Sequence, residues 1–328
     1  MPRVSIIMAV YNGERHVGES LDSLSGQSFR DTEIIVVNDG STDGTVDIVE
    51  RHAARDPRIR LVSRQASGRP SFPRNDGLAL SKGEYVGFLD HDDTSDPERI
   101  SVLVKALDAH PHWVAAFHDL DLIDEEGGSR FSTWFSHLRF VSCCADHFRA
   151  VDGEWLESLP SFPVYASLHT PGMMTQSILI AKDRFSGRLA FDTAYRICDD
   201  TDLWIRIALD GPVGFVNRPY GAYRARAGSL MTQRAAYLRD TAHLHTMNFE
   251  RVKERFEADS LRRYRERIAG HYANLAWYHY DRLEPGCARE ALRSVLAWHA
   301  LPEYRRMLWR SYIPVWLLRF ARAVARRP

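Results

Sequence analysis

The chain contains little cysteine, and the cysteines it has are not spaced as metal ligands. The 328 residues include four: Cys143, Cys144, Cys198 and Cys287. Two are adjacent and two are isolated, which does not fit the paired motifs of zinc sites or the dense disulfide framework of small secreted domains. Cysteine usage therefore favours a reducing, cytoplasmic setting with free thiols.

The chain also lacks net charge and long apolar runs. Lysine plus arginine number 43 and aspartate plus glutamate number 43, so the formal net charge is zero and no nucleic-acid partner is expected. No segment reaches the roughly 18 uninterrupted apolar residues of a membrane span. A strand-like run begins at Val4, where a signal peptide would lie. We expect a cytoplasmic protein, and peripheral attachment to the inner face of the cell membrane stays open.

Up to about residue 120, apolar runs of strand length alternate with stretches of helical periodicity. Strands are predicted at residues 4–10, 33–37, 59–62, 85–89 and 114–117, with amphipathic helices between them. This alternation predicts an α/β fold with a mostly parallel central sheet flanked by helices. A further strand is predicted at 177–180 and a helix at 200–209. We expect one domain over residues 1–228 and a helical carboxy-terminal region over residues 229–328.

A cluster of carboxylates follows the predicted fourth strand: Asp90, Asp92 and Asp93, with His91 between the first two. Carboxylates this close repel one another unless a cation or a set of donors compensates. Hard divalent cations prefer such oxygen ligands and often retain substrate phosphates. The cluster therefore predicts a metal–diphosphate site. The alternative is a loop in which Asp93, Thr94 or Ser95 caps the following helix.

Two more polar segments lie where ligands bind in such sheets, beyond the carboxyl ends of strands. Tyr11-Asn12-Gly13 follows the first strand, and Asn38 to Asp43 follows the second. In the second segment, either Asp39 faces a ligand, or the segment serves only to cap the next helix.

Taken in order, these segments resemble the catalytic domain of family 2 glycosyltransferases. The resemblance covers about residues 3–230 and rests on Val4–Gly13, Gln27–Phe29, Glu33–Gly44, Arg74–Leu78, Gly83–Asp93 and Cys198–Trp204. It implies the GT-A fold, a nucleotide-diphosphate sugar donor and inversion of the anomeric centre.

The resemblance also implies how the donor is held. Asp39 would hydrogen-bond the base, and Arg74 would lie near the nucleotide. Glu14 would either line the pocket or begin a solvated helix. The chain beneath the base would be Ala9, Val10, Tyr11 and Asn12.

The resemblance implies Mn²⁺ or Mg²⁺ at the acidic cluster. Asp90 and Asp92 match the family's Asp-x-Asp, and Asp92 is the main ligand candidate, with Asp90 and Asp93 as supports or alternates. His91 occupies the variable position and belongs to the donor site. A metal there would stabilise the leaving diphosphate as charge develops.

The family's general base corresponds to the second member of the pair Asp199-Asp200. We choose Asp200 for this role and keep Asp199 as a fallback, because family members usually carry glutamate at the first position. The alternative is that both carboxylates only favour a helix amino terminus. The family's Gly-Gly-Phe-Asp is replaced upstream by Leu189–Asp192, which leaves the acceptor undetermined.

The end of the chain is basic and apolar. No acidic residue follows Glu303, and the segment from Tyr304 to Arg327 combines seven arginines with aromatic and aliphatic residues. It either lies on an anionic membrane surface or packs on the catalytic domain or a second subunit of a homo-oligomer. Just before the predicted domain boundary, Arg224 and Arg226 either contact the diphosphate or lie at the surface.

The expected function is transfer of a sugar from a UDP-sugar to a glycan or lipid-linked acceptor, in cell-surface polysaccharide biosynthesis. The alternative is a non-catalytic sugar-nucleotide-binding or scaffold protein of the same fold. Such a protein would be expected to lose the acidic pair, and both carboxylates are present.

Overall fold

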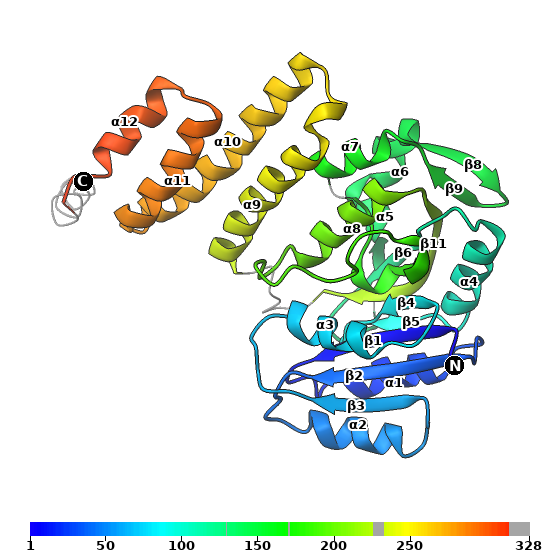
Figure 1. Cartoon of the computed structure of the whole chain (residues 1–328). Coiled ribbons are helices and arrows are strands. Elements are labelled where there is room, and N and C mark those ends of the chain that lie inside the picture. Colours follow the sequence, from blue (N-terminus) through cyan, green and yellow to red (C-terminus); the bar gives the residue numbers. More distant parts are fainter. Residues whose placement is uncertain (129, 170, 226–232, 315–328) are drawn as a thin grey trace. The chain divides into compact units, whose positions relative to one another are not determined.

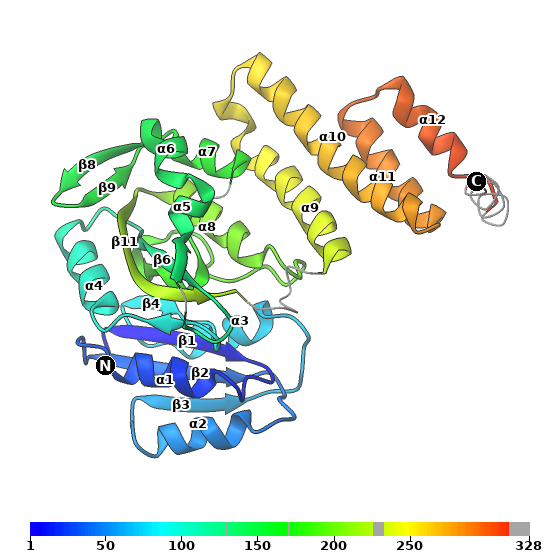
Figure 2. The same cartoon turned by 180° about the vertical axis from the view of Figure 1, so that it is seen from behind.

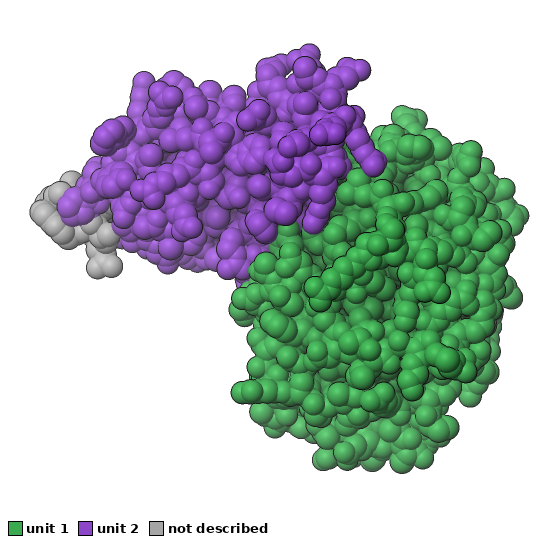
Figure 3. All heavy atoms as spheres, viewed as in Figure 1, with its two compact units in different colours: residues 1–229 green, residues 230–328 purple. Residues whose placement is uncertain are grey.

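The computed structural model describes residues 1–128, 130–169, 171–225 and 233–314 (Figure 1). The chain divides into two compact units, residues 1–229 and residues 230–328, which are coloured separately in Figure 3. Unit 1 is a mixed α/β structure built on one sheet, and the described part of unit 2 is helical.

The amino-terminal half of the sheet is parallel, as predicted. Its strands lie in the order β3-β2-β1-β4, which places the first strand of the chain inside the sheet. Their bounds are β1 Val4–Val10, β2 Thr32–Asn38, β3 Ile59–Ser63 and β4 Tyr85–Phe88. The helices between them are α1 Val17–Ser25, α2 Thr45–Ala53 and α3 Ser71–Leu80.

Beyond β4 the strand directions are mixed, so the sheet is parallel over a smaller part than expected. β10 (Ile178–Ala181) pairs antiparallel with both β4 and β6. It follows a long irregular connection in place of the crossover helix that parallel neighbours require. The order continues through β6 Ala115–Ile123, β11 Val213–Arg224, β9 Trp155–Ser158 and β8 Phe148–Asp152. Two short strands lie outside this order: β5 Thr94–Ser95 pairs with β11, and β7 Arg130–Thr133 pairs with β6.

The strand predicted at 114–117 is longer than its apolar run. β6 extends to Ile123 because it pairs with β11 as far as Ile123 and Arg224, and His118 and Asp119, which interrupt the apolar pattern, are only 0% and 2% exposed. Burial lowers the pKa of His118 to about 3, so the imidazole is neutral inside the sheet.

Helices cover both faces of the sheet. Alternate residues of β1 share a core with residues of α1, α2 and α4 (Arg99–Ala109); they are Val4, Ile6, Met8 and Val10. Figure 2 shows these helices in the view from behind. On the other face, Ile7 shares a core with α8 (Asp199–Asp210) and with the aromatic residues of the irregular middle segment. That segment forms α5 Trp134–Leu138, α6 Phe140–Cys144 and α7 Phe162–Leu168, with single-turn helices at Ala145–His147, Thr175–Ser177 and Lys182–Arg184.

Unit 2 is built from successive helices, as its composition predicted. They are α9 Arg234–Val252, α10 Ala258–Asp281, α11 Pro285–Trp298 and α12 Pro302–Arg310, with a single turn at Lys253–Arg255. The rest of the predicted basic segment, residues 315–327, lies outside the described residues, as does Arg226. Within the described ranges, no helix combines the length and apolarity needed to span a bilayer.

Candidate functional site

The acidic segment, Asp90 to Asp93, lies at the carboxyl end of β4, and its carboxylates differ in burial. Asp90 and Asp92 are half-buried, whereas Asp93 is 1% exposed. Asp93 Oδ1 accepts a hydrogen bond from the Arg224 backbone N–H at 2.8 Å, and its Oδ2 has no hydrogen-bond partner in the described part of the chain. Burial, followed by the charges of Asp92 and Asp90, raises the pKa of Asp93 well above its usual value. This is a concentration of negative charge that a cation would relieve.

The capping alternative for this segment is wrong. α4 begins at Arg99, six residues after Asp93, and the first-turn N–H of Ile100 donates to Gln27 Oε1 at 3.2 Å rather than to a carboxylate of the cluster. Thr94 and Ser95 form the short strand β5, which pairs with β11. The carboxylates therefore do not serve the helix that follows them.

Arg224 is buried and holds the acidic segment through hydrogen bonds to Asp92 and Asp93. Its side chain is 1% exposed, its Nε donates to the backbone oxygen of Asp92 at 2.9 Å, and its Nη2 forms an ion pair with Glu19 at 2.7 Å. The surface role considered for Arg224 is thus excluded. With its guanidinium engaged in this way, Arg224 holds the Asp92–Asp93 backbone in place.

Arg74 joins the acidic segment to the pair on α8. Its Nη2 lies 2.9 Å from Asp90 Oδ1, and its Nη1 lies 3.2 Å from Asp199 Oδ2. Arg74 is 7% exposed, and its guanidinium lies 5.3 Å from the ring centre of Phe191. One buried cation therefore links carboxylates 109 residues apart in sequence, counted from Asp90 to Asp199.

Asn75, the next residue on α3, fixes this arrangement. Its side-chain Nδ2 donates to the Phe191 backbone oxygen, and its Oδ1 accepts from the Phe191 N–H, both at 2.8 Å. A side-chain amide that pairs with both backbone groups of one residue defines both position and orientation. Asn75 thus holds the ring of Phe191 against Arg74.

Asp199 and Asp200 occupy the first turn of α8 and differ in their contacts. Asp199 is 1% exposed and ion-paired with Arg74, whereas Asp200 is half-buried and its Oδ1 accepts from the Thr201 N–H at 2.6 Å. Burial raises the pKa of both carboxyls, and the charge of Arg74 opposes the rise in both. Asp200 is therefore the more accessible of the two carboxylates.

Asp39, at the carboxyl end of β2, is already saturated with donors. It is 4% exposed and forms an ion pair with Arg64, which also binds Asp76 at 2.7 Å. The Ser67 hydroxyl lies 2.9 and 2.8 Å from its two oxygens, and the Ser67 N–H lies 3.1 Å from each. The loop after β3 therefore occupies the carboxylate that was predicted to receive a base.

The loop after β1 contacts both neighbouring polar segments. Asn12 adopts a left-handed φ of 47°, and its Oδ1 accepts from the Thr42 N–H at 2.8 Å. Gly13 lies so close to His91 that a Cβ there would be 2.5 Å from the imidazole Cδ2. His91 therefore packs on the chain between β1 and α1, and a larger residue at position 13 would have to displace the side chains of His91 and Val10.

The remaining predicted donor-site residues differ in accessibility. Val10 is buried, Ala9 is half-buried and Tyr11 is 52% exposed, so Tyr11 presents an accessible ring. Glu14 is exposed, and its Oε2 accepts from the Gly44 N–H at 2.8 Å just before α2. That contact gives Glu14 a structural role between two loops.

Sequence reasoning missed Arg64 and Ser67, and it assigned no role to Asn75, which lies in the Arg74–Leu78 segment of the family resemblance. A signal for Arg64 was present, because it directly follows β3 and the carboxyl ends of parallel strands meet at one edge. For Ser67 no signal was available, since the path of a loop is not encoded in local periodicity.

The carboxylates of the acidic segment fit a divalent cation that would also be bound by a diphosphate. In residues 1–128, 130–169, 171–225 and 233–314, no three acidic, histidine or cysteine side chains form a group that could hold a metal. Mg²⁺ and similar ions are commonly held by one or two carboxylates plus substrate phosphates. Asp92 and Asp90 are accessible enough to bind a metal ion. Asp93 is buried next to them, and its Oδ2 has no hydrogen-bond partner among the described residues.

Comparison with known proteins shows which sequences this chain resembles. Residues 5–141 match the family described as glycosyl transferase family 2. EpsE of Bacillus subtilis, to which a glycosyltransferase activity has been ascribed, is 28% identical over 248 residues, which are 72% of this chain and 77% of EpsE. Of several other relatives the chain spans less than two thirds of the length, in one case 15%.

Solved structures share the fold. S. aureus TarS, residues 1–349 in complex with UDP-GlcNAc, superimposes with a TM-score of 0.63 and 19% identity over 94% of this chain and 84% of that one. The mannosyltransferase PcManGT of Pyrobaculum calidifontis, in complex with GDP-Man and Mn²⁺, superimposes with a TM-score of 0.53 and 18% identity. The match covers 97% of this chain and 83% of that one. The predicted GT-A architecture with a helical carboxy-terminal region is confirmed.

Proposed function

We propose that this chain, of which residues 5–141 match glycosyl transferase family 2, is an inverting enzyme that transfers a sugar from a nucleotide diphosphate to a hydroxyl acceptor. The observation that carries the proposal is the Arg74 bridge, which holds Asp90 on the donor side and Asp199 beside the candidate base. Donor binding and proton removal are the two needs of this reaction, and one buried cation joins the residues for both.

The proposed donor is a UDP-sugar. Support comes from TarS, which binds UDP-GlcNAc, and from the polar ends of β1, β2 and β4, which meet at one edge of the sheet. Tyr11 offers an exposed ring near the base site, and Asp39 offers a carboxylate once the Ser67 loop yields. Arg74 contributes positive charge next to the diphosphate position.

The proposed metal is Mn²⁺ or Mg²⁺, held by Asp92 with help from Asp90. PcManGT was solved with Mn²⁺ on a similar fold. When bound, the ion neutralises the charge that develops on the leaving diphosphate. Asp93 and Arg224 fix the backbone from which Asp92 projects.

The proposed general base is Asp200, and Asp199 is a positioning residue. Asp199 is held by Arg74, so its carboxylate is committed to an ion pair. Burial raises the pKa of Asp200, so its carboxylate is a stronger base than an exposed aspartate. Asp200 would take the acceptor's proton as the hydroxyl oxygen attacks the anomeric carbon and the nucleotide diphosphate leaves from the opposite face.

We propose a glycan or lipid-linked glycan as acceptor, in cell-surface polysaccharide biosynthesis. Attachment to a membrane surface would use the outer face of α12, where Trp309 is 76% exposed and Arg305 and Arg310 are exposed. The inner face packs within unit 2 through Met307. A homo-oligomer remains part of the proposal without a face assigned to it.

A donor screen tests the proposal. UDP-sugars and GDP-sugars are tested for thermal stabilisation and slow hydrolysis, each with Mn²⁺, Mg²⁺ or EDTA. We expect one UDP-sugar to raise the melting temperature in a metal-dependent way and to be hydrolysed. The Asp183→Asn variant, changed at an exposed carboxylate elsewhere, should behave as wild type. Binding without hydrolysis or transfer would favour the scaffold alternative, and no binding would refute the donor assignment.

A further inference from the structure

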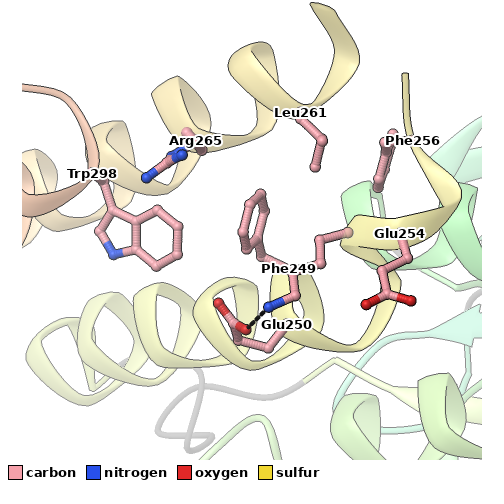
Figure 4. A pocket seen from close by; sticks show the side chains of 8 residues that line it. Phe249, Glu250, Glu254, Phe256, Leu261, Arg265 and Trp298 are labelled. Atoms are coloured by element: carbon pink, nitrogen blue, oxygen red, sulfur yellow. Dashed lines mark hydrogen bonds and ion pairs between the residues drawn. The ribbon is translucent and has the colours of Figure 1, made fainter. Parts of the chain in front are cut away.

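Unit 2 contains a cavity that the transfer reaction does not use. It has a volume of about 590 Å³ and is formed by α9, the turn after it, α10 and the end of α11 (Figure 4). Small-molecule sites typically enclose about 300–1,000 Å³. The cavity is therefore large enough for one or two sugar rings.

Aromatic side chains form its floor and walls. Phe249 lies centrally in Figure 4 and is 7% exposed, with Trp298 on one side and Phe256 on the other. Phe249 meets Trp298 edge to face at 5.1 Å, and both Phe249 and Phe256 contact the buried Tyr264, at 5.5 and 5.7 Å. These contacts fix the rings before any ligand arrives, so binding would order few side chains.

The rim is polar and electrically balanced. Glu250 and Glu254 supply two carboxylates, and Lys253 and Arg265 supply two cations. Glu250 and Lys253 pair with each other at 2.7 Å. Arg265 lies 5.8 Å from the ring centre of Trp298, and within the described part of the chain no ion pair involves it. Donors and acceptors therefore surround an aromatic floor with no net charge.

We propose that this cavity is a carbohydrate-binding site for one or two pyranose rings of an uncharged glycan. A pyranose has an apolar face of C–H groups, which stacks on an aromatic ring, and an edge of hydroxyls, which needs both donors and acceptors. The cavity offers both. A phosphorylated or anionic ligand would meet the carboxylates of Glu250 and Glu254, and a purely apolar one would strip water from four charged groups without replacing it.

The site deepens the proposed function by naming where a glycan acceptor is recognised outside the catalytic domain. Only that link to the acceptor rests on the proposed transfer activity, because sugar binding in unit 2 requires neither Asp200 nor a donor. Failure of the two proposals is therefore distinguishable. Sugar binding that persists in Asp200→Asn and weakens in Arg265→Ala supports the site whether or not transfer occurs.

The test is saturation-transfer NMR on the full chain with six probes. They are the methyl β-glycosides of glucose, galactose and N-acetylglucosamine, and the disaccharides cellobiose, lactose and chitobiose. We expect at least one disaccharide to bind, with the C–H protons of one ring face receiving most saturation. Trp298→Ala and Arg265→Ala should each weaken that binding by about tenfold.

Matched controls keep the test specific. Arg263→Ala changes an exposed arginine of the same helix, and Trp277→Ala removes an exposed tryptophan elsewhere in unit 2. Both should retain full binding. If Trp298→Ala unfolds unit 2, the test rests on Arg265→Ala, because Arg265 is exposed and its replacement should leave the fold intact. Failure of all six sugars to bind, binding of inorganic phosphate in their place, or equal loss in the control variants would overturn the proposal.

Discussion

Arg74 and Asp199 form a buried ion pair of 3.2 Å, and the same guanidinium holds Asp90 at 2.9 Å. The pair joins α3 to the first turn of α8 across 125 positions of the chain. Because Arg74 and Asp199 are both nearly inaccessible to water, neither charge is compensated by solvent when the other is removed. The geometry of the candidate site therefore depends on this contact.

Replacing Arg74 by alanine should destabilise the protein. The change leaves Asp199 buried without its cation, and breaking one side of a buried pair costs about 3–5 kcal/mol. Urea unfolding of Arg74→Ala, Asp199→Asn and the double variant measures the coupling. We expect the double variant to be more stable than Arg74→Ala alone. If the two single effects add, the pair is not coupled, and this account of the site is wrong.

Removing the Ser67 hydroxyl should strengthen binding of a uracil nucleotide. In this structure the hydroxyl donates to Asp39, the carboxylate proposed to receive the base. A competing hydrogen bond contributes about 1 kcal/mol, so Ser67→Ala should lower the UDP dissociation constant severalfold. Asp39→Asn should raise it. Calorimetric titration with UDP and Mn²⁺ measures both dissociation constants. If Ser67→Ala binds UDP more weakly than wild type, Ser67 contributes to the base site and the prediction is wrong.

Stability should fall on acidification partly through Glu157. Hydrogen bonds from Trp113, His112 and Arg149 outweigh burial and lower its pKa from 4.5 to about 2. A carboxyl with a lowered folded-state pKa contributes stability that is complete above its unfolded pKa, about 4.5. That contribution is lost as the pH falls from there toward 2. Glu157→Gln should remove this part of the pH dependence.

The matched control for Glu157 is Glu154→Gln in the same β-hairpin region, where the side chain is exposed. Denaturant unfolding between pH 2 and 7 compares the variants. At neutral pH, Glu157→Gln should lose about 1–3 kcal/mol, since it weakens hydrogen bonds to a buried charge. Parallel stability curves for wild type and Glu157→Gln would contradict the assignment.

The outer face of α12 should bind anionic membranes. Replacing Trp309 and Tyr312, which are 76% and 55% exposed, by alanine removes interfacial aromatic side chains from a basic segment. Co-sedimentation with phosphatidylserine-containing vesicles should fall by about tenfold. Trp277→Ala, at a 51% exposed site, is the control. Unchanged sedimentation of the α12 variant would leave this face without a membrane role.

Much of unit 1 could be predicted because its strands are near-continuous apolar runs. β1 was located to the residue and β2 to within one, and the start of α8 to within one. The polar strand ends were found because turns at one sheet edge need residues such as Asp39 and Asp90. These features depend on local pattern, which the sequence displays directly.

What could not be predicted depends on tertiary contacts. His118 is buried in β6 although it and Asp119 interrupt the apolar run, and Arg224 is buried beside the acidic segment although arginine is usually exposed. Ser67 reaches Asp39 through a loop without periodicity. Each of these placements is decided by packing between segments far apart in the chain.

The most direct test of the central claim follows the anomeric configuration of the sugar released from an α-linked UDP-sugar. Time-resolved proton NMR, recorded before mutarotation, distinguishes the two anomers. If Asp200 activates the attacking hydroxyl in an inverting reaction, wild type releases the β-anomer first, and Asp200→Asn binds UDP with Mn²⁺ but releases almost none. Release of the α-anomer, or undiminished release by Asp200→Asn, would contradict the account.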